Sequence, residues 1–164
     1  MSILFVCLGN ICRSPLVAAV ASRRFELAGL SVEVDSCGTG GWHVGHQADP
    51  RSIEVAEAAG YRLRTHRARQ LCEQDYVRFD WLLAMDTDNL KVLHQRAPRA
   101  NAAKLALFLD AAGMGISQPV PDPYYGDIAD FRAVLQLAEQ GIDGLIRQLR
   151  QKPIAGGNSA LAAG

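Results

Sequence analysis

The first fifteen residues constrain the fold most, because they join an apolar strand to a helix through a short loop. Residues 2–7 contain a continuous apolar run that ends at Cys7, a pattern typical of a strand buried on both faces. Gly9 follows, and Ser14-Pro15 predicts a helix N-cap with proline at the first helical position. A buried strand that leads directly into a helix predicts an α/β protein.

The same alternation continues along the chain. Further strands are predicted at 32–34, 81–85 and 103–109, and helices at 16–27, 49–60, 86–95 and 127–151. A polar, glycine-rich loop is predicted for 36–47. Strands that alternate with helices indicate a parallel sheet with right-handed crossovers and helices on both faces. We expect one domain over residues 1–152, followed by a disordered tail over 153–164.

Composition excludes several classes of partner. Lysine plus arginine, 17, equals aspartate plus glutamate, 17, so neither nucleic acid nor an anionic membrane is expected to attract the chain. No stretch approaches the roughly 20 apolar residues of a spanning helix, and the predicted location is cytoplasmic. The four cysteines include no Cys-x2-Cys pair, which favours free thiols over a zinc site or a disulfide framework.

The loop after the first strand has the chemistry of an anion site. Ligands of open parallel sheets bind beyond the carboxyl ends of the strands, where Cys7 lies. Gly9 and Asn10 tolerate the positive φ angles that turn backbone amides inward, and a helix N-terminus follows. Arg13 adds a guanidinium that can hold two oxygens of a tetrahedral oxyanion. This positive environment favours the thiolate of Cys7, which is the nucleophilic form.

Spacing alone does not carry this interpretation, because Cys72 and Arg78 repeat the same Cys-x5-Arg interval. That second copy has no apolar strand before it and no glycine, and it contains Glu73 and Asp75, which would repel an anion.

A cysteine nucleophile in an anion site suggests attack on the phosphorus of a phosphate ester. Hydrolysis of such an ester also needs a general acid that protonates the leaving oxygen. Asp122 is the candidate, since it lies in a loop with Pro121 and Pro123, beside Tyr124 and Tyr125. Taken alone, an ordinary Asp-Pro turn explains the same dipeptide better.

The segment from Cys7 to Pro15, Cys-Leu-Gly-Asn-Ile-Cys-Arg-Ser-Pro, resembles the signature loop of the low-molecular-weight protein tyrosine phosphatases. The resemblance covers residues 1 to about 150 and includes Asp35-Ser36, Thr65-His66-x-Ala68-Arg69, Met85-Asp86-x2-Asn89 and Asp122-Pro123-Tyr124-Tyr125-Gly126. It implies a three-layer α/β fold with a four-stranded parallel sheet in the order 2-1-3-4.

The resemblance also implies a role for each site residue. Cys7 is the nucleophile, Arg13 holds the phosphate and Asp122 is the general acid. The loop residues that bind phosphate are Leu8, Gly9, Asn10, Ile11 and Cys12, together with Arg13. The residues that support the loop are Ser14, Ser36 and His66. The residues that line the substrate cleft are Leu8, Trp42, Tyr124 and Tyr125.

The implied reaction is hydrolysis of phosphotyrosine and aryl phosphates through a cysteinyl-phosphate, without metal or cofactor. The partner is then a tyrosine-phosphorylated protein, opposite a tyrosine kinase, and the enzyme is a monomer or weak dimer. Cys12, by resemblance, forms a reversible disulfide with an oxidised Cys7, although a small buried hydrophobe is the simpler role. His43 and His46 are i, i+3 neighbours, and a solvated loop explains them better than a metal site does.

Three alternatives stay open. An arsenate reductase shares the fold, but Cys37 and Cys72 lack the nearby cysteine partner that its thioredoxin-coupled members use. A protein-arginine phosphatase carries threonine at the position of Ile11, where an apolar side chain favours an aromatic ring. A non-hydrolysing phosphocysteine carrier or binding module has little use for Arg13 together with Asp122.

Overall fold

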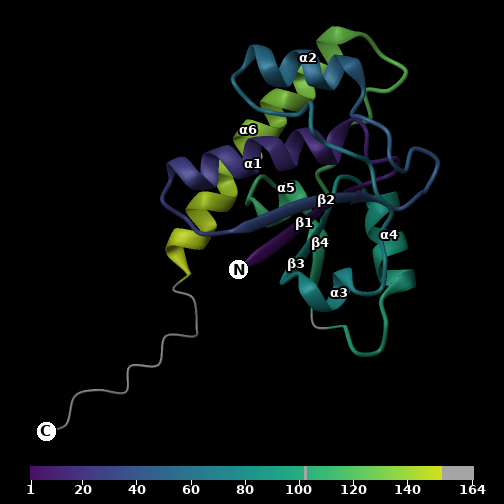
Figure 1. The fold of residues 1–164 in the computed structure, drawn as a ribbon. Coiled ribbons are helices and arrows are strands. Elements are labelled where there is room, and N and C mark those ends of the chain that lie inside the picture. The colour runs from purple at the N-terminus through teal and green to yellow at the C-terminus, as the bar shows by residue number, and fades with distance from the viewer. Residues whose placement is uncertain (102, 153–164) are drawn as a thin grey trace, which may run out of the picture.

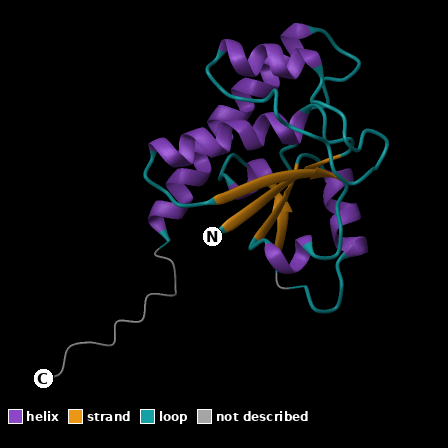
Figure 2. Cartoon of the chain, viewed as in Figure 1, coloured by secondary structure: helices purple, strands orange, loops and turns teal. Residues whose placement is uncertain are grey.

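The protein is described from a computed structural model that covers residues 1–101 and 103–152, and Figures 1 and 2 show its arrangement. Four strands and six helices occur in the described part of the chain. In order they are β1 (Ser2–Cys7), α1 (Arg13–Leu27), β2 (Glu33–Gly38), α2 (Pro50–Ala58), α3 (Asp75–Arg78), β3 (Trp81–Ala84), α4 (Thr87–Arg96), β4 (Lys104–Leu107), α5 (Phe108–Ala111) and α6 (Ile128–Gln151). The tail predicted for 153–164 lies outside the described residues.

The strands form one parallel sheet in the order β2-β1-β3-β4, as predicted. β1 is central, pairs with β2 and β3, and is buried along its whole length. Cys7 pairs with Gly38 at the last position of the β1–β2 register. The carboxyl ends of all four strands therefore meet at one edge of the sheet, and the residues that follow them converge there.

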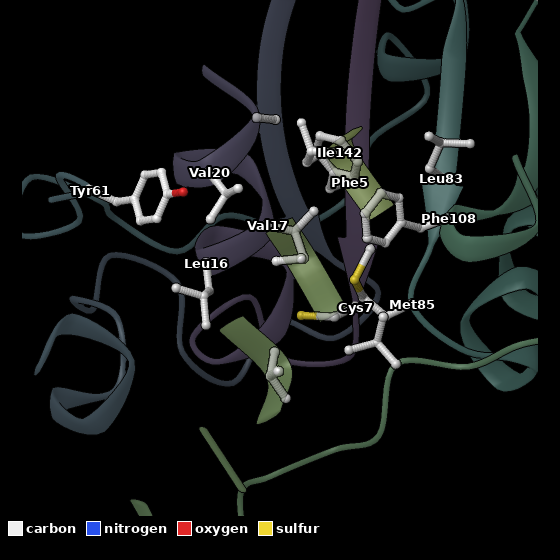
Figure 3. Packing of buried hydrophobic residues seen from close by; sticks show 14 of the residues in the cluster. Phe5, Cys7, Leu16, Val17, Val20, Tyr61, Leu83, Met85, Phe108 and Ile142 are labelled. Atoms are coloured by element: carbon white, nitrogen blue, oxygen red, sulfur yellow. The ribbon is translucent and has the colours of Figure 1, made fainter. Parts of the chain in front are cut away.

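Two apolar clusters cover the two faces of the sheet. Phe5 and Leu83 point into the larger cluster, which packs beneath α1, α2, α5 and α6 (Figure 3), and Phe5 meets Phe108 edge to face at 5.4 Å between ring centroids. Leu4 and Leu82 point into the smaller cluster under α3 and α4. This alternation follows from the two-residue period of a strand. It gives the predicted three layers and makes β1 a rigid base for the loop that follows it.

The chain departs from prediction at several boundaries. β2 continues through Ser36 and Gly38, which were predicted as loop, because Cys37 is buried on the α3–α4 face and the strand pairs with β1 to its end. Phe108 and Leu109 begin α5 rather than ending β4. The short helix α3 was not predicted. No helix among the described residues is both long and apolar enough to span a bilayer.

The predicted helix ends are mostly confirmed. Asp49 caps α2, with its side chain accepting from the amide of Arg51, and Asp127 caps α6. α1 ends at Leu27, as predicted, and Gly29 follows with a φ of 70°. The predicted Ser14 cap is wrong: α1 begins at Arg13, Cys12 is at the N-cap position, and the Ser14 hydroxyl turns toward Cys7 instead.

Candidate active site

The loop from Cys7 to Ser14, which we call the cysteine loop, surrounds the Cys7 thiol with hydrogen-bonding groups. The amide of Asn10 donates to Cys7 Sγ at 3.3 Å, and Ser14 Oγ lies 2.9 Å from the same sulfur. Asn10 Nδ2 already donates to Ser14 Oγ at 2.9 Å. When Cys7 is a thiolate its sulfur can only accept, so the hydroxyl of Ser14 then donates to Cys7 Sγ rather than to its other acceptor, the Cys37 carbonyl at 3.4 Å.

Asn10 holds the cysteine loop in its shape. The residue has no exposed surface, and its φ is 57°, a left-handed conformation that asparagine adopts more readily than most residues do. Its Nδ2 donates to Ser36 Oγ at 2.9 Å as well as to Ser14, and its Oδ1 accepts from the amide of Arg69 at 3.0 Å. One side chain thus ties the loop to β2 and to the segment before α3.

The backbone carbonyl of Asn10 has its own partner in His66, whose Nε2 lies 2.8 Å away. Burial lowers the pKa of His66, so the ring is neutral at pH 7. The Nε2 atom must then carry the proton, because the carbonyl can only accept. Ser14, at the end of the loop, and Ser36 and His66, outside it, thus all contact groups of the cysteine loop.

Arg13 is 3% exposed and is held from two sides. Its Nη1 donates to Asp86 Oδ2 at 2.6 Å and to the Val120 carbonyl at 3.1 Å. Asp86 is itself fixed, because it caps α4 by accepting from the amide of Asn89. The Nη2 atom of Arg13 lies 3.7 Å from Asp122 Oδ2. The Arg13 side chain, which was predicted to hold an oxyanion, is therefore oriented by Asp86, which follows β3, and by Val120 in the segment before α6.

Asp122 belongs to an acid loop, residues 120–126, that reaches over the same edge of the sheet. The Asp122 side chain is 45% exposed, and its Oδ1 accepts from the amide of Tyr124 at 3.1 Å. Arg51 of α2 holds the backbone of this loop, since its guanidinium donates to the carbonyls of Tyr124 and Gly126, each at 3.0 Å. The loop backbone is anchored while the carboxyl group stays accessible.

A single pocket of about 240 Å³ brings these groups together. Cys7, Arg13 and Asp122 all line it, and its walls contain the predicted cleft residues Leu8, Trp42, Tyr124 and Tyr125. Gly9, Ile11, Cys12 and His43 complete the lining. Asn10, Ser14, Ser36 and His66 do not line it; they lie behind it.

Two details of this pocket were not predicted. His43 lines it, although its sequence context predicted only a solvated loop. A Cβ on Gly9 would lie 3.0 Å from the His43 ring. Gly9 leaves room for this close approach, and it does not adopt the predicted positive φ. No group of three metal-ligating side chains occurs within residues 1–101 and 103–152.

The other cysteines have distinct environments. Cys12 is buried in the pocket wall, and this burial, assisted by the carboxylate of Asp49, raises the pKa of its thiol to about 12. The Cys72 copy of the spacing forms no cradle: Cys72 contacts Asp75, and Arg78 pairs with Glu33.

The arrangement suits attack of the Cys7 sulfur on the central atom of a tetrahedral oxyanion. Cys7 lies at the base of the pocket with amide and hydroxyl donors around it, Arg13 supplies a fixed cation, and Asp122 supplies a carboxyl group at the mouth. Fixed donors of this kind stabilise charge that develops in a transition state.

Comparisons with known proteins agree with this chemistry. Residues 2–154 match the family model described as low molecular weight phosphotyrosine protein phosphatase. A phosphatase of that name from Schizosaccharomyces pombe is 46% identical over 129 residues, which cover 77% of this chain and 82% of the relative.

Solved structures give the same result. A protein tyrosine phosphatase from Entamoeba histolytica with Hepes in its active site superposes with a TM-score of 0.85 at 37% identity, over 92% of this chain and 97% of the other. A Drosophila arginine phosphatase superposes with a TM-score of 0.86 at 27% identity, over 92% and 98%. With its sheet order and its cysteine loop, this chain belongs to the low-molecular-weight protein tyrosine phosphatase family.

Proposed function

We propose that this protein hydrolyses phosphotyrosine in proteins, and aryl phosphates in general, through a phosphate ester on Cys7. The observation that carries this proposal is the convergence of Cys7, Arg13 and Asp122 on one pocket. No other described cysteine combines a place in this pocket with hydrogen-bond donors directed at its sulfur.

In the first step Cys7 Sγ attacks phosphorus and the bond to the tyrosine oxygen breaks. Arg13 and the amides of the cysteine loop hold the equatorial oxygens, and Asp122 gives its proton to the leaving phenolate. The Ser14 hydroxyl, directed at Cys7 Sγ, stabilises the thiolate before attack. The side chains of Asn10, Ser36 and His66 position the loop.

In the second step water attacks the cysteinyl-phosphate. Asp122, now ionised, accepts a proton from this water as the sulfur–phosphorus bond breaks, and the thiolate of Cys7 is restored. Proton transfer by one carboxyl group in both directions closes the cycle, and inorganic phosphate leaves. The positive charge that the phosphoryl group needs comes from Arg13 and backbone amides.

The walls of the pocket favour tyrosine over serine. Trp42 is 70% exposed and Tyr125 is 96% exposed, and both border the pocket that has Cys7 at its base. Aromatic walls suit an aryl ring, whereas the short side chain of phosphoserine would leave its phosphorus out of reach of Cys7.

An arginine phosphatase is the second candidate, because a protein of that name shares the fold. Ile11 lines the pocket where a guanidinium would need a polar partner. We therefore expect kcat/KM for phosphotyrosine to exceed that for phosphoarginine, and Ile11→Thr to narrow the difference. A wild-type preference for phosphoarginine would select this second function.

The test of the main proposal is Cys7→Ser. This variant loses phosphotyrosine hydrolysis, because the serine hydroxyl is a far weaker nucleophile than a thiolate, and it should retain phosphotyrosine peptides in a pull-down. Rapid acid quenching of the wild type with ³²P-labelled substrate should trap the phosphate on Cys7. Hydrolysis by Cys7→Ser at the wild-type rate rules the mechanism out, and a phosphoryl-cysteine that persists without turnover indicates a carrier.

Further proposals concern the source of the substrate, the location of the enzyme and its oligomeric state. We propose that a tyrosine kinase generates the substrate and that the enzyme works in the cytoplasm as a monomer or weak dimer. We also propose the domain boundary at residue 152, one residue beyond the end of α6.

We further propose that Cys12 protects an oxidised Cys7. Peroxide converts the Cys7 thiolate to a sulfenic acid; the Cys12 thiol then condenses with it, forming a disulfide and releasing water. Both residues border the same pocket. After peroxide treatment, dithiothreitol should restore activity to the wild type but not to Cys12→Ser. Equal recovery of both proteins eliminates this role.

A further inference from the structure

A second pocket, of about 560 Å³, adjoins the catalytic pocket, and we call it the flanking pocket. The two share Leu8 and Trp42, which line both. These side chains are therefore the wall between the pockets. A peptide whose phosphotyrosine fills the catalytic pocket carries its neighbouring side chains along this wall.

The wall is held firmly by the segment after β2. The amide of Gly40 donates to the Leu8 carbonyl at 2.9 Å, which joins that segment to the cysteine loop. The indole of Trp42 lies directly on Gly40, where a Cβ atom would overlap the ring. Glycine at this position thus lets Trp42 lie between the two pockets.

Among the described residues that line the flanking pocket, Arg96, at the end of α4, is the one charged side chain. Its Nη1 donates to the Thr39 carbonyl at 2.8 Å, which fixes the guanidinium. Among the residues that the structure describes, no carboxylate lies within 4.0 Å of it to neutralise its charge. Arg69, in contrast, is neutralised by Asp35 and Asp75.

The remaining lining is uncharged. Thr39, Gly40 and Gly41 contribute mainly backbone, Val92 is apolar, and Gln70 is occupied by a hydrogen bond from its Nε2 to the Thr39 carbonyl at 3.1 Å. A fixed, unneutralised guanidinium in a pocket without other charges attracts a carboxylate.

We propose that the flanking pocket binds an acidic side chain of the substrate, within about three residues of the phosphotyrosine. This inference rests on the proposed function and narrows it: the preferred substrates carry aspartate or glutamate beside the phosphorylated tyrosine. An extended peptide advances about 3.3–3.6 Å per residue, so only near neighbours can cross the wall while the aryl phosphate stays over Cys7.

The experiment measures kcat/KM on phosphotyrosine peptides in which one residue, from three before to three after the phosphotyrosine, is glutamate or glutamine. At low salt we expect the wild type to prefer glutamate at one or two positions by about two- to fivefold, the range of an exposed ion pair. Added salt should weaken this preference. Arg96→Gln, which keeps a donor for Thr39, should abolish it, and Arg96→Glu should reverse it in favour of the glutamine peptides.

Two controls separate this inference from the proposed function. Arg147→Gln makes the same change in net charge on α6, outside both pockets, and should keep the glutamate preference. p-Nitrophenyl phosphate fills only the catalytic pocket, so Arg96→Gln should hydrolyse it at the wild-type rate. Peptides that are hydrolysed with equal kcat/KM for glutamate and glutamine at every position overturn the inference alone. Failure to hydrolyse any phosphotyrosine peptide overturns both proposals.

Discussion

The cysteine loop and the acid loop meet at one pocket but are built in opposite ways. In the cysteine loop, Asn10 is fully buried and Arg13 nearly so, and their side chains contact partners from four distant segments. In the acid loop, Asp122 is about half exposed, and its closest contact is a local one to the amide of Tyr124.

The difference reflects what each loop does in the proposed reaction. The cysteine loop must present fixed donors to phosphate oxygens, and donors that are already oriented need no reorganisation during the reaction. Asp122 must exchange protons with a leaving group and then with water, which requires access to solvent. Substitutions in the cysteine loop should therefore change both stability and activity, whereas substitution of Asp122 should change activity alone.

Asp122→Asn gives the largest expected effect on this comparison. Asparagine keeps an oxygen that can accept from the Tyr124 amide but cannot protonate the leaving group. We expect kcat on phosphotyrosine to fall by about 10²–10⁴, while the free energy of unfolding stays within about 0.5 kcal/mol of wild type, as for most exposed positions. A smaller loss is expected for p-nitrophenyl phosphate, whose leaving group needs less protonation. Steady-state kinetics on both substrates, with thermal denaturation, would reveal a structural role if stability fell as well.

Arg13→Lys tests the other loop. Lysine keeps the charge but loses the planar fork, and it cannot satisfy Asp86 and the Val120 carbonyl while also holding phosphate. We expect kcat to fall by about 10²–10³ together with a measurable loss of stability. Arg147→Lys on the exposed face of α6 is the matched control and should change neither quantity. Undiminished stability in Arg13→Lys would remove the contrast with Asp122.

Prediction from sequence succeeded where neighbours in the chain are also neighbours in space. Cys7, Arg13 and Ser14 lie within eight residues, so strand, loop and helix signals place them together. The bonds from Asn10 to Arg69 and from Arg13 to Asp86 and Val120 join residues 59 to 107 positions apart. Local patterns do not encode such contacts, and the family resemblance gave only part of this set.

Two of the prediction errors, at Ser14 and at the end of β2, have a common physical cause. Ser14 has the residue type and position of a helix cap, but its hydroxyl is engaged by Cys7 and Asn10. Ser36 and Gly38 have loop composition, yet they continue β2 because the strand must reach beneath the cysteine loop to support Asn10. At a functional site, polar residues satisfy the site before they satisfy local propensity.

A pair of substitutions at Asn10 separates side-chain bonds from backbone conformation. Asn10→Gly removes the bonds to Ser14, Ser36 and Arg69, whereas Asn10→Ala also places an unsuitable residue at a φ of 57°. We expect Asn10→Gly to lose about 1–3 kcal/mol of unfolding free energy and Asn10→Ala to lose about 1–2 kcal/mol more. Urea denaturation measures both, and equal losses would show that the left-handed conformation carries no cost. Both variants should also lower kcat.

Substitution of His66 gives the smallest expected effect, which is a change in how the free energy of unfolding depends on pH. Burial lowers its pKa in the folded protein below the ordinary value of 6.5. Well above pH 6.5 the ring is neutral in both states, so it contributes no pH dependence there. As the pH falls from about 6.5 toward the folded pKa, the unfolded chain binds a proton that the folded protein does not, and the free energy of unfolding decreases.

His66→Gln should remove this dependence, because a glutamine amide can donate to the Asn10 carbonyl but does not titrate in this range. Urea denaturation at intervals from pH 8 to pH 5 should show wild-type stability declining relative to His66→Gln below pH 6.5. His94→Gln, an exposed change on α4, is the control and should follow the wild-type curve. Parallel curves for wild type and His66→Gln would mean that the imidazole titrates alike in the folded and unfolded states. The description of His66 as a buried, neutral donor to the cysteine loop would then be wrong.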